Sequence, residues 1–174
     1  AEDTGTNLVG ESSGMMHDRP RWSKFELATL SWGYGLAITP MQLARFYATL
    51  ANGGIKRELS IVKTAQKNEG VRIFSQANAN AVMTMLESVV DEHVQKAKVA
   101  GYRVGGKTGT AESYGNKKNR INTFISIFPA NKPNYVLFVM LENPKINKNL
   151  IYSYRGTKTK APYNTSGWNS VYVA

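Results

Sequence analysis

The sequence predicts an α+β fold in which helices pack on a small antiparallel sheet. Two observations carry this prediction. Apolar residues recur at helical spacing in the first half of the chain, up to about residue 94. Beyond that point the spacing becomes that of strands, and the connecting segments are short enough for antiparallel neighbours. Helices followed by strands in this way are typical of a domain whose helices cover one sheet.

Length and composition indicate one soluble domain over residues 1–174. A chain of 174 residues with 42% hydrophobic and 20% charged residues can bury a single core. The longest apolar run, 135–141, is too short to cross a bilayer, and residues 1–30 lack the pattern of a secretory signal. The aperiodic stretch at 1–14 fits either a segment cut from a longer chain or an expression remnant.

The charge and side-chain inventory excludes several kinds of site. The 22 Lys and Arg residues against 12 Asp and Glu give a net charge of +10, which favours nucleic acid, acidic polymers or carboxylate substrates as partners. Without cysteine there is no disulfide framework, thiolate nucleophile or Cys-based zinc site. His17 and His93 are too few for a His-rich metal site and are interpreted as surface residues. We therefore expect no metal and no cofactor.

The first half of the chain predicts two principal helices. Residues 40–52 begin after an N-cap at Thr39, with Pro40 at the first helical position and Gln42 completing a capping box. A second helix is expected from an N-cap at Ser75 to about Val94, where His93 lies near the C-terminal end.

Three further segments of this half have weaker sequence patterns than the two helices. Residues 22–30 fit a short helix, and residues 55–63 fit a short strand or an extended connector. In the Gly-punctuated loop 31–35, the rings of Trp32 and Tyr34 fit either the core or a pocket wall, and burial in the core is the preferred interpretation because aromatic residues mostly bury.

The second half predicts three strands, at 102–111, 121–128 and 135–141. We expect 121–128 to lie between the other two, so that 102–111 and 135–141 form the edges. The residues after Pro144 are polar and weakly patterned. Because the run 135–141 is apolar on both faces, we expect its uncovered edge to make the isolated chain self-associate.

The chemically informative stretch is the run GGKTGTA at 105–111, on an edge strand. In an ideal pleat, Lys107 and Gly109 face one side while Thr108 and Thr110 face the other. Strand twist and glycine freedom near an edge are expected to let these polar ends converge on one cleft. An ammonium and two hydroxyls beside free backbone N–H groups form a receptor for a carboxylate, and Gly109 lets an extended peptide lie against the strand.

Several further segments accompany this motif in order. They are GESSGMM at 10–16, RPRWS at 19–23, the run LSWGYGLAITPMQLARFYATLANGG at 30–54 and GYRVGGKTGTAE at 101–112. Together they resemble the C-terminal half of the transpeptidase domain of class B penicillin-binding proteins, most closely the septal cell-division type, over most of residues 8–145. Lys-Thr-Gly is the third active-site motif of penicillin-binding proteins and β-lactamases.

The resemblance implies a partial serine transpeptidase or β-lactamase-like fold and an enzyme that cross-links peptidoglycan. Stem peptides and β-lactams would be its ligands. Lys107 would supply positive potential, the hydroxyls of Thr108 and Thr110 would bind the terminal carboxylate, and the N–H of Thr110 would form half of the oxyanion hole. Gly109 would keep the strand open to substrate. The family also implies the periplasmic face of the bacterial inner membrane, reached through an N-terminal anchor that this chain lacks.

The chain departs from the family by lacking the Ser-x-x-Lys nucleophile and the Ser-x-Asn element, which precede residue 10 in the family. Ser60 and Lys63 match the first motif by letter but lie in an extended segment, whereas the nucleophile belongs at a helix start. The run Tyr114-Gly115-Asn116 resembles a variant of the second motif but follows Lys107 in a basic loop. Both are interpreted as chance matches, and the chain alone is predicted to be inactive.

The sequence also fits two other interpretations of its function. Basic clusters at 117–120 and 155–160, with Tyr152 and Tyr154 nearby, would suit a nucleic-acid-binding module. Such loops are more often simply solvated, so no nucleic-acid partner is predicted. A non-catalytic family relative that serves as an interaction scaffold would also lack the nucleophilic serine.

Overall fold

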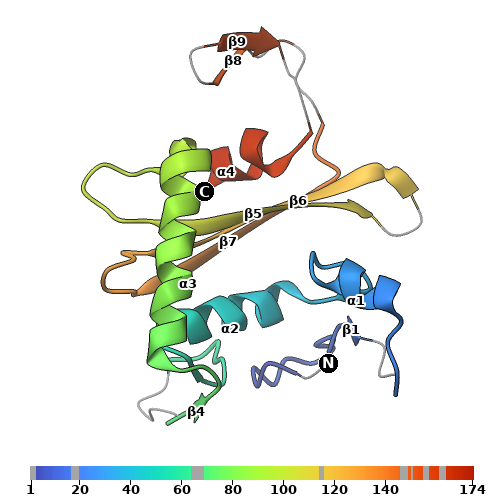
Figure 1. Ribbon diagram of the computed structural model, residues 1–174, viewed down its shortest axis with the longest axis vertical. Coiled ribbons are helices and arrows are strands. Elements are labelled where there is room, and N and C mark those ends of the chain that lie inside the picture. The colour runs from blue at the N-terminus through green and yellow to red at the C-terminus, as the bar shows by residue number, and fades with distance from the viewer. Residues whose placement is uncertain are drawn as a thin grey trace.

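A three-stranded antiparallel sheet lies at the centre of the computed structural model, which describes residues 3–16, 20–63, 69–113, 116–145, 149, 151–154, 157–160 and 164–174. Its order is β5-β6-β7, formed by β5 (Gly105–Ser113), β6 (Asn116–Phe128) and β7 (Tyr135–Glu142). Helices lie on both sides of this sheet (Figure 1). The predicted α+β class and the predicted strand order are therefore confirmed.

Two helices cover one face of the sheet and build the core. They are α2 (Pro40–Ala51) and α3 (Gln76–Ser88), and α3 continues into a π-helical turn, η1 (Val89–His93). Leu86 of α3 lies against Gly105 at the start of β5. The buried side chains of this core are Leu50, Met83, Leu86, Ile127 and Ala130. The amphipathic spacing read from the sequence thus faces the sheet.

The capping signals of α2 act as the sequence predicts. Thr39 accepts a hydrogen bond from the Gln42 N–H at 3.2 Å, while the Gln42 side chain accepts one from the Thr39 N–H at 2.9 Å. Pro40 occupies the first helical position, where its missing N–H costs nothing. Gly53 and Gly54 follow the helix with φ of +67° and +91°, a conformation that favours glycine. These local signals fix both ends of the helix.

The opposite face of the sheet is covered by the C-terminal residues. A 3₁₀ turn, η3 (Ser166–Trp168), and a short helix, α4 (Ser170–Val173), contact β6 and lie beside the turn η2 (Gln95–Ala97). The Lys96 ammonium lies 4.2 Å from the ring centre of Trp168 and 4.3 Å from that of Tyr172. These cation–π contacts connect η2 to the C-terminal turn and helix. The sheet is therefore the middle of three layers (Figure 1).

The other elements are short. Three two-stranded ribbons pair antiparallel, and α1 precedes the loop of residues 31–35. These elements are β1 (Met15–Met16) with β2 (Leu36–Ala37), β3 (Ile55–Lys56) with β4 (Val71–Arg72), β8 (Ile151–Tyr154) with β9 (Thr157–Lys160), and α1 (Lys24–Leu30).

A carboxylate organises the residues before β1. The hydroxyls of Thr4 and Thr6 donate to Glu11, as does the Thr4 N–H at 3.0 Å. These hydrogen bonds, that from the Thr4 hydroxyl first, lower the pKa of Glu11. Arg45 of α2 donates to the Asp3 carbonyl at 2.8 Å. The start of the described chain is thus held close to α2.

One prediction about the first half is wrong. Trp32 and Tyr34 are 66% and 60% exposed, so their rings do not join the core. The segment 55–63 fits the prediction of a short strand or an extended connector, since only β3 pairs with a strand. The helix predicted from Ser75 to about Val94 is confirmed, as α3 to Ser88 and the π-helical turn η1 to His93.

No helix in the described part of the chain is both long enough and apolar enough to span a membrane.

The outer strand β7 leads us to expect self-association of the chain. Among the described residues no strand pairs with its outer side, and Tyr135 and Met140 are 64% and 46% exposed. An apolar edge of this kind is a template for pairing with a second chain. Light scattering at micromolar concentration is expected to give a mass above that of the monomer.

A charge on this edge should reduce the association. Met140→Lys is expected to shift the mass toward the monomer, whereas Met85→Lys on the exposed side of α3 serves as a matched control and leaves it unchanged. A monodisperse monomer that unfolds cooperatively would show that β7 needs no cover.

Candidate active-site strand

The four predicted site residues lie side by side on the edge strand β5. Lys107, Thr108, Gly109 and Thr110 stand opposite Ile125, Phe124, Thr123 and Asn122 of β6, respectively. Among the described residues, no strand pairs with the other side of β5. The sequence therefore predicted correctly that this motif lies on an edge with one side of its backbone available.

The backbone of this stretch has a defined direction. The Gly109 carbonyl accepts from the Thr123 hydroxyl at 3.3 Å, so it points toward β6. Peptide groups alternate along a strand, and the N–H and C=O of Thr108 and Thr110 therefore point to the free edge. The Lys107 ammonium donates to the Thr108 carbonyl at 2.8 Å, as that direction allows. The free edge thus offers the N–H of Thr110 to a ligand.

The glycines of this run lie close to β6. A Cβ at Gly106 would lie 2.8 Å from the Phe124 ring and 3.0 Å from the Ile125 carbonyl oxygen, so a larger residue there would push β5 away from β6. A Cβ at Gly109 would lie 2.5 Å from the Thr123 hydroxyl oxygen, so a larger residue there would have to displace the Thr123 side chain.

The side chains do not converge on one cleft as expected. Lys107 is exposed and bonds at the free edge, while the Thr110 hydroxyl bonds to Ser166 of η3, on the opposite face of the sheet. Thr108 is half-buried on the same face as Thr110. The ideal alternation of the pleat persists here because the ladder with β6 continues without a shift from Gly105 to Glu112. Lys107, Thr108 and Thr110 therefore share only their position on the free edge of β5.

Sequence analysis missed Ser166. Its hydroxyl donates to the Gly109 carbonyl, and the Thr123 N–H donates to that hydroxyl at 3.2 Å. The Ser166 N–H also donates to the Thr110 hydroxyl at 3.2 Å. Ser166 lies 57 residues from Gly109 in a polar segment without periodicity, so no local pattern identifies it.

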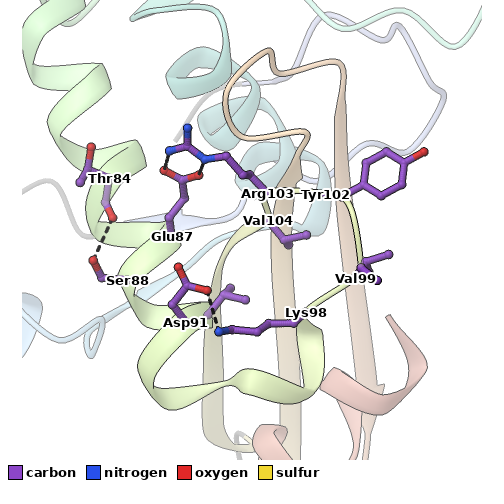
Figure 2. Close-up of a pocket in the computed structure, with 11 residues that line it drawn as sticks. Thr84, Glu87, Ser88, Asp91, Lys98, Val99, Tyr102, Arg103 and Val104 are labelled. Carbon is purple, nitrogen blue, oxygen red and sulfur yellow. Dashed lines mark hydrogen bonds and ion pairs between the residues drawn. The ribbon is translucent and has the colours of Figure 1, made fainter.

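The start of β5 is fixed from the other face by ion pairs. Arg103 Nε and Nη2 each donate to a carboxylate oxygen of Glu87 at 2.7 Å, and Lys98 lies 2.9 Å from Asp91 (Figure 2). Hydrogen bonding to Glu87, followed by its charge, raises the pKa of Arg103. Both pairs border a groove of about 560 Å³ between α3, η1 and the segment that leads into β5. The pairs thus attach this segment to the helix layer.

Of the two chance matches, the structure describes Ser60, Lys63 and Asn116. Ser60 donates to the Val62 carbonyl at 2.6 Å in a bend outside any helix, and Lys63 is exposed. Tyr114 and Gly115 lie outside the described residues, and Asn116 begins β6. His93 is a surface residue as predicted, whereas His17 lies outside the described residues. Within the described ranges, no three His, Cys, Asp or Glu residues gather as metal ligands do.

Comparison with known proteins decides the family. The model of the penicillin-binding protein transpeptidase domain matches residues 1–164. The chain belongs to this family. Peptidoglycan D,D-transpeptidase FtsI of Escherichia coli K12 is 41% identical over 165 residues, which cover 91% of this chain and 27% of the relative. The probable peptidoglycan D,D-transpeptidase PenA of Neisseria gonorrhoeae is 36% identical over 145 residues, covering 80% and 25%.

Solved structures agree with this assignment. The apo transpeptidase domain of penicillin-binding protein 3 from Burkholderia pseudomallei superposes with a TM-score of 0.75 at 38% identity, covering 81% of this chain and 45% of that one. A peptidoglycan synthetase from Bifidobacterium adolescentis gives 0.75 at 30% identity, covering 83% and 29%. The resemblance to class B penicillin-binding proteins and the transpeptidase-like fold are thereby confirmed. The chain spans about a quarter of the length of its curated relatives.

The two hydrogen bonds from the Arg103 guanidinium to Glu87 should hold the start of β5 in this transpeptidase-family chain. Arg103→Ala is expected to lower the midpoint of urea unfolding and to speed amide exchange at 105–107. The decrease in the midpoint should be smaller in about 1 M NaCl than in about 0.1 M NaCl, because salt screens the ion pair. Arg103→Lys should fall between, because lysine lacks the planar fork. Lys132→Ala, which removes an exposed lysine, is the control, and equal effects of both alanine variants would contradict this role.

Proposed function

We propose that this chain is the carboxylate-binding part of a serine D,D-transpeptidase that cross-links peptidoglycan in cell division, with the nucleophile in a segment outside these 174 residues. The observation that carries the proposal is the free edge of β5, where the Lys107 ammonium and the Thr110 N–H lie along one line of backbone. Such an edge can hold an extended peptide as an added strand. The family match over residues 1–164 supports this use of the strand.

The reaction would proceed in two acyl transfers. A serine oxygen attacks the carbonyl between the last two D-alanines of a stem peptide, and the terminal D-alanine leaves with a proton. An amine of a neighbouring stem then attacks the serine ester, which forms the cross-link and releases the serine with its proton. A β-lactam would acylate the same serine. In both transfers negative charge develops on the carbonyl oxygen, which the Thr110 N–H is placed to stabilise.

Each residue of the motif has a separate task in this proposal. Lys107 supplies positive charge next to the serine of the missing Ser-x-Asn element. Thr108 and Thr110 bind the terminal carboxylate, and Thr110 turns its hydroxyl from Ser166 to do so. Gly109 keeps β5 close to β6, which holds the two threonines in place. The proposed location is the periplasmic face of the inner membrane, with stem peptides and β-lactams as ligands and no nucleic acid.

The isolated chain should form no covalent adduct with a labelled penicillin. Acylation needs a serine activated by a neighbouring base, and among the described residues Ser60 hydrogen-bonds only to Val62. Intact mass spectrometry after incubation is expected to show the unmodified mass. A stoichiometric adduct on Ser60 would contradict the assignment of the nucleophile to another segment.

In the full-length protein, Lys107→Ala and Thr110→Val should each slow acylation by a labelled β-lactam by roughly 10²-fold or more, the usual loss when one preorganised charge or donor is removed. Lys132→Ala and Thr84→Val are matched controls, because they make the same changes at residues outside β5 and should keep the rate. Unchanged rates in both site variants would refute the proposed role of the strand. A full-length protein without an acylable serine would instead favour an interaction scaffold.

A further inference from the structure

Ser166 hydrogen-bonds to the peptide group that the proposed chemistry uses. Its side chain is 1% exposed, and it lies on η3, against the middle of β5. The hydroxyl donates its single proton to the Gly109 carbonyl. Gly109 C=O and Thr110 N–H belong to one planar peptide unit and point in opposite directions. A bond to this carbonyl therefore fixes the direction of the Thr110 N–H at the free edge.

The hydrogen bonds around Ser166 form a complete set. The Ser166 oxygen accepts from the Thr123 N–H at 3.2 Å and lies 2.9 Å from the Thr110 hydroxyl. Because the Ser166 proton is used on Gly109, the Thr110 hydroxyl is the donor in that contact. Ser166 thus uses one donor and two acceptor positions, and it connects β5 to β6. A side chain that is hydrogen-bonded in this way is held in one orientation.

The turn that carries Ser166 is itself held in place. Asn122 of β6 donates to Asn164 at 2.8 Å, and Asn164 donates to the Pro144 carbonyl at 2.8 Å. On the other side of the turn, the Ser170 hydroxyl donates to the Ser166 carbonyl at 3.2 Å. The Ser166 hydroxyl therefore approaches Gly109 from a fixed support.

We propose that Ser166 is a positioning residue for acyl transfer, acting through the Gly109–Thr110 peptide. Its bond to the Gly109 carbonyl aims the Thr110 N–H along the free edge and polarises the peptide, which strengthens that N–H as a donor. A preorganised donor stabilises the oxyanion without reorganising during the reaction. This inference rests on the proposed function of β5, and it adds a residue outside the Lys-Thr-Gly motif to the machinery.

The first test uses the chain as it is. Ser166→Ala removes the donor, so the ¹³C resonance of the Gly109 carbonyl and the ¹⁵N resonance of the Thr110 amide should both move upfield. Thr49→Val is the matched control, because it removes another buried hydroxyl, one that lies on α2 and bonds within that helix. Ser166→Thr keeps a hydroxyl and should restore the resonances. Unchanged Gly109 and Thr110 resonances in Ser166→Ala would overturn the inference, whatever the function of the strand.

The second test measures acylation by a labelled β-lactam in the full-length protein. Ser166→Ala should lower the first-order acylation rate about three- to tenfold, the range expected for one hydrogen bond, and leave the preceding non-covalent affinity unchanged. Thr49→Val should keep the rate even where it lowers the unfolding midpoint equally, which separates positioning from stability.

The two proposals fail differently in this assay. A normal rate in Ser166→Ala beside slow Lys107→Ala and Thr110→Val would overturn the inference and leave the proposed function intact. A normal rate in Lys107→Ala and Thr110→Val would refute the proposed function and the positioning role with it. A loss of affinity alone in Ser166→Ala would also overturn the inference, because the peptide N–H is assigned to the transition state.

Discussion

The close approach of β5 to β6 is the constraint on which the rest of the structure depends. A Cβ would meet the Phe124 ring at Gly106 and the Thr123 hydroxyl at Gly109, and one at Gly105 would lie 3.2 Å from Leu86 on α3. At this separation the ladder runs without a shift from Gly105 to Glu112. The register then decides which peptide groups face β6 and which face the free edge. A strand pushed outward would lose both the ladder and the direction of the Thr110 N–H.

The edge strand β5 receives support from both layers that cover the sheet. From the helix layer, Glu87 on α3 holds Arg103 just before β5 begins. From the C-terminal layer, Ser166 bonds to Gly109 and Thr110 in the middle of β5. The two supports act on different peptide groups, so neither can replace the other. An edge strand, which has a partner on one side only, needs such additional contacts to hold its geometry.

Local signals explain what the sequence could predict. The capping box at Thr39 and Gln42 places α2 because all its parts lie within four residues. The three strands follow from their apolar spacing and short connections, and the edge position of Lys107 follows from their order. The exposure of Trp32 and Tyr34 was wrongly predicted, because burial depends on what packs against a loop and not on residue type. Ser166 was missed since its partners are distant in sequence.

The position of Ser166 also explains why the motif alone is a weak signal of geometry. The residue types Lys-Thr-Gly-Thr show which groups are available, but the Lys107 and Thr110 side chains do not converge here. In the proposed acyl transfer the strand acts through the direction of one peptide, which is set by β6 on one side and by a buried hydroxyl on one face. Because a peptide is rigid, fixing its carbonyl fixes its N–H as well. A buried contact on the covered face of the strand therefore sets the direction of the N–H at its free edge.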